Sequence, residues 1–316
     1  MSQKASIFIL FICLFISEVI KSQTSVIVAG AIPNYKERHI GIAFFEDYLD
    51  YERKVAAKTI TSRSGTFILK FKWTKSWPAF LILENETVEL FLVPGDSLYI
   101  NGKYKKLATT SKFSGSAAYA NSYLAEHRVK FSKMREQTDK KQKKMNINEK
   151  LILHDTMYYR EMKSFAKINK NKAPEFYNYM YANIEYYYAN KIFFYGLSRS
   201  EIEERIQKIN YNNEDALSSM YYVIFLENYL NFLTEIKKRE MKEKIDNFWD
   251  FQFNIIKENF TGKVMDILMA RLINKTFNYT TIVTTRSLLN KYYNVYKNIL
   301  FYQKLEKKFN DKNKNY

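Results

Sequence analysis

The chain has 316 residues, of which 47% are hydrophobic, and a formal net charge of +17. This length and apolar fraction are enough for two domains with cores of their own, which excludes an intrinsically disordered protein. The charge favours acidic partners such as anionic lipid or polysaccharide. Abundant Lys, Asn, Ile, Tyr and Phe also fit the coding bias of an AT-rich genome, so the charge alone does not establish a basic binding face.

The N-terminus predicts a secretory signal peptide over residues 1–23. Lys4 precedes an apolar run from Ala5 to Ile16, and a polar stretch ends at Gln23. This order of charge, apolar core and polar exit is typical of secretory signals, and the run is shorter than the ~20 residues of a spanning helix. We therefore expect export, a periplasmic or otherwise extracytoplasmic location, and no transmembrane span once the signal is removed.

The only cysteine, Cys13, lies within this predicted signal. Ile12 precedes it, where the attachment of a lipid to an exported cysteine needs a small residue. The mature chain then contains no cysteine, which excludes disulfides, thiolate nucleophiles and cysteine-based metal sites. Loss of Lys4, Glu18 and Lys21 with the signal leaves a net charge of +16.

The glycines are concentrated in the first part of the chain, and only Gly196 and Gly262 follow Gly115. Before Gly115, turn residues separate short runs rich in Val, Ile, Phe and Thr, which predict strands. The predicted strands are 25–31, 39–45, 54–60, 66–72, 79–83, 87–93, 97–101 and 107–113. Partial alternation predicts that 66–72 is half-buried, and the nearly continuous apolar run 88–93 predicts a central strand. Their close spacing predicts an antiparallel β-sandwich over residues 24–115.

Beyond Gly115, apolar residues recur three and four apart, which predicts helices. The predicted helices are 116–144, 147–169, 174–194, 201–209, 214–236, 241–259, 262–275 and 285–309. Pro174 suits a first helical turn, and Ser198 with Glu201 predicts a capping box. The predicted fold class is therefore α+β, with the β-sandwich followed by an irregular all-α domain over 116–309 and a frayed tail over 310–316.

Three segments resemble a known family: 93–100 (VPGDSLYI), 113–124 (FSGSAAYANSYL) and 261–272 (TGKVMDILMARL). They are similar to the N-terminal accessory region of TlpA-like thioredoxin-fold proteins of the bacterial envelope. In that family a β-sandwich leads into a helical segment, and a thioredoxin domain usually follows. The resemblance implies this fold over most of residues 24–309. We expect the thioredoxin domain to be absent, and without a Cys-x-x-Cys motif no redox residue is carried over.

The segment Pro94-Gly95-Asp96 can also be interpreted from its residue types, without the family resemblance. Pro fixes φ and Gly reaches conformations that other residues adopt only at a cost, which predicts a turn. A ligand-binding loop is the alternative.

The sequence offers no recognisable catalytic, cofactor or metal motif. His39, His127 and His154 lack metal-type spacing, and there is no Gly-x-Ser-x-Gly elbow and no glycine-rich phosphate loop. The carboxylate pairs Glu84 with Glu86 and Glu203 with Glu204 lie among polar neighbours, as solvated surface residues do. We expect no catalytic residue, no cofactor and no metal.

Two clusters could instead form a ligand or partner surface. The basic run from Lys130 to Lys144 can meet phosphates of lipid or glycan, or it can be a solvated helix face. The aromatic cluster from Tyr177 to Tyr195 can stack on sugars or grip a peptide, or it can fill the helical core with its hydroxyls at the rim. The candidate contact residues are Tyr186, Tyr187, Tyr188, Lys140, Lys141, Lys143 and Lys144.

These observations predict an exported, non-enzymatic cell-envelope module that binds a protein, a peptide or an anionic glycan and has no thiol redox activity. Nucleic acid is excluded as a partner, because export separates the chain from it and no nucleic-acid-binding motif is recognisable. Two alternatives stay open. The chain is an accessory subunit of a separate thioredoxin-like reductase, or it is an enzyme of unrecognised type.

Overall fold

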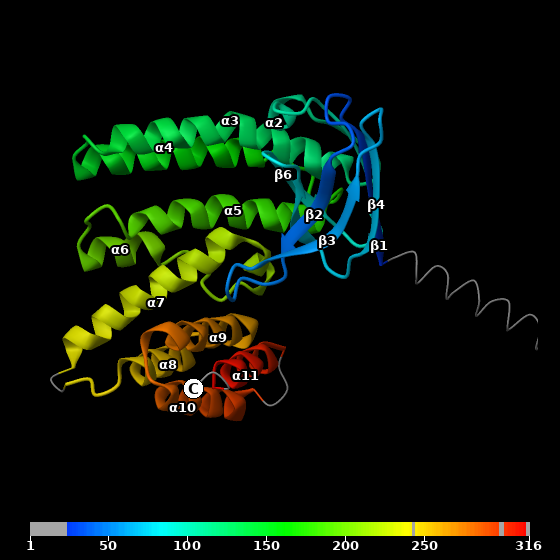
Figure 1. Cartoon of the computed structure of the whole chain (residues 1–316). Helices are drawn as coiled ribbons and strands as arrows, with labels where there is room; N and C mark the ends of the chain where they lie inside the picture. The colour runs from blue at the N-terminus through cyan, green and yellow to red at the C-terminus, as the bar shows by residue number, and fades with distance from the viewer. Residues whose placement is uncertain (1–23, 242–243, 297–299, 314–316) are drawn as a thin grey trace, which may run out of the picture. The chain divides into compact units, whose positions relative to one another are not determined.

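The structure is a computed structural model that describes residues 24–241, 244–296 and 300–313, so the predicted signal peptide lies outside the described residues (Figure 1). The chain divides into two compact units. Of the described residues, the sheet unit comprises 24–46, 53–144 and 169–177. The helical unit comprises 47–52, 145–168, 178–241, 244–296 and 300–313.

The sheet unit contains two four-stranded sheets, with strand orders β4-β1-β7-β8 and β3-β2-β5-β6. The strands are β1 (Ser25–Ala31), β2 (His39–Phe45), β3 (Arg53–Ile60), β4 (Thr66–Lys72), β5 (Trp77–Ile82), β6 (Thr87–Leu92), β7 (Ser97–Asn101) and β8 (Lys112–Ser114). All neighbours pair antiparallel except β1 and β7, which are parallel. One apolar cluster joins both sheets, with Val28 and Leu69 from the first and Ile42 and Leu81 from the second. The predicted sandwich is confirmed.

The tight turn between β6 and β7 has the predicted geometry. Asp96 N donates to Val93 O at 3.0 Å, and Gly95 has φ +89°, as a type II turn with proline at its second position requires. The Asp96 carboxylate accepts hydrogen bonds from Val93 N at 2.7 Å and Ser116 Oγ at 3.0 Å. Burial raises the pKa of Asp96 above its usual value, and these two hydrogen bonds oppose that rise. The polar atoms of this segment are thus engaged within the fold.

Two strand predictions were wrong. A single strand was expected over 107–113. Leu107–Thr110 instead form the short helix α2, and only the three residues of β8 (Lys112–Ser114) pair with β7. Thr110 Oγ1 donates to Lys106 O at 2.8 Å and accepts from Lys103 N at 3.0 Å, so the threonine side chain closes a turn where a strand was expected.

The apolar strand β6, expected at the centre of a sheet, lies at the end of one. Helix α3 (Ala118–Gln142) packs against it and belongs to the sheet unit. This helix covers β6, most of whose side chains are buried, which explains why its sequence is typical of a central strand. The last strand ends at Ser114 and α3 begins at Ala118, but the compact units do not divide the chain there, because α3 groups with the sheets.

The helical unit is built from the remaining long helices. They are α4 (Ile147–Phe165), α5 (Pro174–Ile192), α6 (Arg199–Ile206), a 3-10 turn η1 (Glu214–Ser218), α7 (Met220–Glu240), α8 (Phe248–Asn259), α9 (Gly262–Tyr279), α10 (Ile282–Val295) and α11 (Leu300–Asn313). The first residues of α5, up to 177, group with the sheet unit. Pro174 begins α5, and Ser198 forms the predicted capping box with Glu201. Among the described residues, no helix combines the length and hydropathy needed to cross a bilayer.

Three helix predictions need correction. The expected helix 214–236 is broken at Ser219, whose side chain accepts from Tyr222 N and starts α7 afresh. The expected helix 241–259 starts later, because Asn247 caps α8 through the amides of Trp249 and Asp250. The expected helix 285–309 is two helices, since Tyr296 turns to extended backbone after α10. In addition, α11 reaches Asn313, so the described part of the predicted tail is helical.

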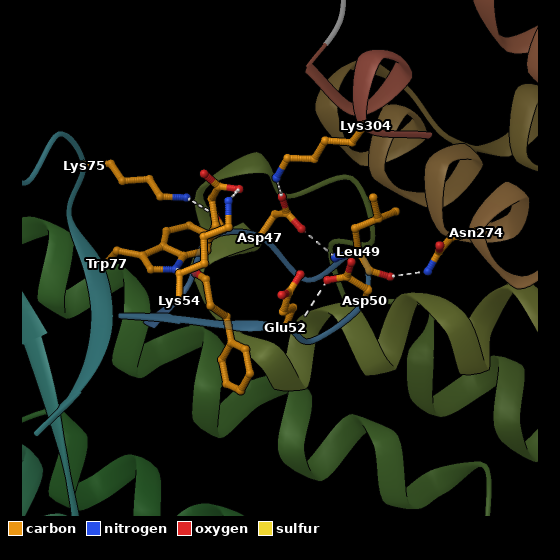
Figure 2. A network of polar contacts seen from close by, with 11 residues as sticks. Asp47, Leu49, Asp50, Glu52, Lys54, Lys75, Trp77, Asn274 and Lys304 are labelled. Carbon is orange, nitrogen blue, oxygen red and sulfur yellow. Dashed lines mark hydrogen bonds and ion pairs between the residues drawn. The ribbon is translucent and has the colours of Figure 1, made fainter. Parts of the chain in front are cut away.

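A short loop from the β2–β3 connection belongs to the helical unit. Leu49, only 6% exposed, lies in the same apolar cluster as Leu268 of α9 and Leu305 of α11. Asn274 Nδ2 donates to Leu49 O at 3.2 Å, and Lys304 Nζ pairs with the Asp47 carboxylate at 2.5 Å (Figure 2). Residues 47–52 therefore belong to the helical unit and place Leu49 in its core, although the sequence sets them between two strands.

Candidate functional site

The sheet unit contains an open groove of about 490 Å³. One wall is a single face of α3, formed by residues at positions 122, 125, 126, 129 and 130. This spacing of three and four residues is that of one helix surface. The opposite wall is formed by the end of α2 and by β8. The volume of the groove lies within the range of small-molecule pockets, which is about 300–1,000 Å³.

The wall formed by β8 ends its sheet. The strand pairs with β7 through Ile100 opposite Phe113, and no other described strand lies beyond it. In an antiparallel pair, alternate residues turn their N–H and C=O groups toward the partner strand. The remaining backbone groups of β8 therefore point to its outer edge, where an added strand can pair with them.

The side chains of the groove combine an apolar floor with a basic rim. Phe113 is half-buried and Val129 is 50% exposed, and both line the groove. Lys112 and Lys130 are exposed at its rim and Glu126 is the one acidic lining residue, so the lining carries a net positive charge. This composition suits a segment with apolar and acidic side chains, because it buries apolar surface and pairs its charges.

Ser111 also lines the groove, but its Oγ is buried and has no hydrogen-bond partner among the described residues. A buried hydroxyl is not within reach of a ligand in the groove. The groove thus offers a strand edge, an apolar floor and two cations.

The predicted lysines lie at the far end of the helix that lines the groove. Lys140 and Lys141 are in the last turn of α3, and Lys143 and Lys144 follow it; all four are exposed. Lys140 Nζ pairs with Glu136 at 2.6 Å. At a rise of about 1.5 Å per residue, Lys140 lies roughly 15 Å along the axis from Lys130. The basic run that the sequence singles out therefore begins in the groove and extends away from it.

The predicted tyrosines lie in α5, within the helical unit, and two of them are core residues. Tyr186 is 1% exposed, donates to Asn210 O at 2.6 Å, and packs on Tyr222 with ring centroids 4.4 Å apart. Tyr188 is also buried and donates to Glu161 Oε2 at 2.8 Å. Burial of these side chains leaves neither ring face open to a ligand.

Tyr187 is half-buried, with its ring 5.2 Å from that of Tyr221 and Lys191 Nζ 4.8 Å above it. Of the three candidate tyrosines, Tyr186 and Tyr188 thus fill the helical core, which is one of the two interpretations, and only Tyr187 keeps partial access to solvent.

His154 and the carboxylate of Asp266 have structural partners. His154 Nε2 lies 3.1 Å from Tyr188 O and its Nδ1 lies 2.9 Å from Asp155 Oδ1. Burial raises the pKa of Asp266, which accepts a hydrogen bond from the Tyr292 hydroxyl. No group of three or more His, Cys, Asp or Glu side chains that could hold a metal occurs within the described residues.

Sequence reasoning missed most of the groove residues for a physical reason. The α3 face in the groove is made of Ser122, Ala125, Glu126, Val129 and Lys130, which show no apolar periodicity and no motif. Of these, only Lys130 belonged to a predicted cluster. The segment 107–113 was also predicted as one strand instead of α2 followed by β8, so the sequence did not predict the second wall of the groove. The one available signal was the start of the basic run at Lys130.

Comparisons of the chain with protein-family models, with curated proteins and with solved structures find no match.

Proposed function

We propose that this protein is an exported, non-enzymatic binding module of the cell envelope that holds an extended, acidic peptide segment of a partner protein in the groove between β8 and α3. The observation that carries the proposal is that β8, whose outer edge pairs with no described strand, and one face of α3 line a single groove. A strand added to β8 gains backbone hydrogen bonds, and the α3 wall selects its side chains. A peptide suits this geometry better than a glycan, because a glycan cannot continue the β-ladder.

The charges support an acidic ligand. Lys112 and Lys130 flank the groove, and α3 continues with Lys133, Lys140 and Lys141. Opposite charge speeds encounter and fixes orientation more than it adds affinity. We therefore expect binding that weakens with rising salt and association rates that fall with it.

Selection of random twelve-residue peptides on the protein tests the proposal. Selected peptides should be rich in acidic residues, and their binding should weaken at least tenfold, about 1.4 kcal/mol, in Lys130→Glu and in Val129→Arg. Fluorescence anisotropy with one labelled peptide measures this. The matched control is Lys144→Glu, which makes the same charge change just beyond the same helix and outside the groove, and should bind like the parent.

The peptide backbone gives a second readout. N-methylation at successive peptide positions should abolish binding at one or two alternate positions and be tolerated at their neighbours, because β8 has three residues and only alternate amides pair with a neighbouring strand. Uniform tolerance of N-methylation, or equal binding by Lys130→Glu and Lys144→Glu, would contradict strand addition. Selective retention of an anionic glycan in the same groove, with no peptide enriched, would replace the peptide by the glycan.

Export rests on the N-terminal sequence and has its own test. Expressed in a Gram-negative host, the protein should be found outside the cytoplasm with Thr24 as its first residue. Leu10→Arg, which places a charge in the apolar run, should leave it in the cytoplasm at full length. N-terminal sequencing and intact mass measure both. Recovery of the unchanged parent from the cytosol with Cys13 still present would refute export.

A further inference from the structure

A small cavity in the helical unit lies beside a buried cation. It has a volume of about 20 Å³ and is lined by residues of α7, α8 and α9, among them Arg271. The Arg271 side chain is only 6% exposed. A cavity of this size holds one water or one monatomic ion and is too small for phosphate or sulfate.

The guanidinium of Arg271 is incompletely satisfied. Its Nε donates to Glu227 Oε1 at 3.0 Å and its Nη2 donates to the Tyr51 hydroxyl at 3.1 Å. The third nitrogen, Nη1, is buried and has no hydrogen-bond partner among the described residues. A buried donor that belongs to a charged group is costly to leave unpaired, so the site favours an acceptor at Nη1.

The local charge favours a negative acceptor. Lys275 Nζ pairs with the same Glu227 oxygen at 2.7 Å, so one carboxylate serves two cations and the trio carries a net charge of +1. Coulombic attraction is stronger in such a partly buried site than in water. A neutral water at Nη1 would satisfy the hydrogen bond but not the charge.

The rest of the lining suits a halide. Gln252 is buried and donates through Nε2 to Thr234 Oγ1 at 3.3 Å, which leaves the second hydrogen of its amide available. Leu230, Leu268 and Leu272 supply the apolar lining. Asn231 and the Glu227 carboxylate, which is paired with Arg271 and Lys275, complete it. Chloride and bromide have a lower charge density than fluoride or a carboxylate oxygen, so apolar contacts cost them less hydration free energy.

We infer that this cavity is a binding site for one monovalent halide, chloride in physiological salt, held by Arg271 Nη1. The site belongs to the helical unit and does not depend on the peptide groove. Its occupation completes the hydrogen bonding of Arg271 and offsets the excess positive charge of the Arg271–Glu227–Lys275 trio. The halide therefore stabilises the junction of α7 and α9.

Bromide supplies the direct test. In crystals grown with sodium bromide, an anomalous peak should lie within hydrogen-bond reach of Arg271 Nη1. In solution, the unfolding midpoint should rise by about 2–4 °C and then saturate as chloride replaces gluconate at constant ionic strength, because gluconate is too large for the cavity.

Two variants separate the site from a general salt effect. Lys275→Met removes one cation of the trio and leaves Arg271 in place, and should raise the half-saturating chloride concentration about tenfold. Lys263→Met makes the same change near the start of α9, where the lysine is 75% exposed and pairs with Glu214, and should respond like the parent. An ordered water only, with no anomalous peak, overturns the inference, as do identical chloride responses in the two variants.

Discussion

Replacement of Asn121 by alanine is expected to lower the free energy of unfolding of the sheet unit by about 2–4 kcal/mol. Asn121 is 1% exposed on α3 and faces β6, the last strand of its sheet. Its Oδ1 accepts from Phe91 N at 2.9 Å, and its Nδ2 donates to Phe91 O at 3.0 Å. The side-chain amide thus supplies to β6 the donor and acceptor that a further strand would supply.

The cost comes from the backbone groups left behind. Alanine at position 121 withdraws both hydrogen bonds from a buried N–H and C=O, and each such loss costs about 1–3 kcal/mol. Asn121→Asp removes only one of the two hydrogen bonds, because a carboxylate can accept from Phe91 N but cannot donate to Phe91 O. We expect its destabilisation at neutral pH to equal or exceed that of alanine, since a charge is then buried beside a carbonyl oxygen.

Urea denaturation in a Trp249→Phe background measures this effect, since the fluorescence then comes from Trp73 and Trp77 of the sheet unit. Arg128→Ala, an exposed change on the same helix, is the control and should shift the free energy by less than about 0.5 kcal/mol. A loss below about 1 kcal/mol for Asn121→Ala would show that water replaces the amide at the edge of β6.

The role of Asn121 illustrates what the sequence could and could not predict. Alternation in β4 and the apolar run in β6 identified both strands, because burial on one or two faces leaves a direct mark on composition. A central strand and an edge strand covered by a helix have the same apolar composition, so the sequence of β6 does not distinguish them. The distinction depends on a contact between residues 30 positions apart, which no local pattern records.

Local capping chemistry set several boundaries that periodicity missed. Ser219 and Asn247 begin α7 and α8 within stretches whose apolar spacing predicted uninterrupted helices. A capping residue competes with helix continuation only when the flanking segments pack in different directions, and packing is a property of the whole fold. The capping box at Ser198 was predictable because both of its partners lie within four residues.

The candidate groove was less predictable than the fold. The wall from α3 has mixed polarity, since it faces solvent in the free protein and gains nothing from an apolar stripe. The tyrosines of α5 were candidate contact residues because they are closely spaced in the sequence. Tyr186 and Tyr188 are nevertheless buried, and their hydroxyls form hydrogen bonds inside the helical unit. Composition marks large buried aromatic clusters more strongly than it marks a mixed binding surface.

Leu49→Ala is expected to destabilise the helical unit by about 2–4 kcal/mol, as for other buried leucines. The residue comes from the connection between two strands, where loop positions ordinarily tolerate substitution. Its side chain is nonetheless 6% exposed within the apolar cluster of α7, α9 and α11. Alanine removes the contacts of the leucine side chain and leaves a cavity that rigid helices fill only in part.

The surrounding polar contacts argue that the loop cannot collapse to fill that cavity. Leu49 N donates to Asp47 Oδ1 at 3.0 Å and Leu49 O accepts from Asn274, so the backbone is held on both sides of the side chain (Figure 2). Tyr51 has φ +56°, a conformation that few non-glycine residues adopt, and its hydroxyl accepts from Arg271. A fixed backbone leaves the cavity open, which places the expected cost in the upper part of the range.

Hydrogen exchange resolves the effect by unit. In Leu49→Ala, amides of α9 should exchange faster by the factor that the lost stability predicts, roughly 30-fold to 900-fold for 2–4 kcal/mol where exchange follows unfolding of the unit. The matched control is Val55→Ala in β3, which truncates an apolar side chain close to Leu49 in the sequence. Val55 is 62% exposed, so this variant should change the exchange rates of α9 by less than about twofold. Equal protection of α9 in the two variants would mean that the loop contributes nothing to the stability of the helical core, despite the burial of Leu49.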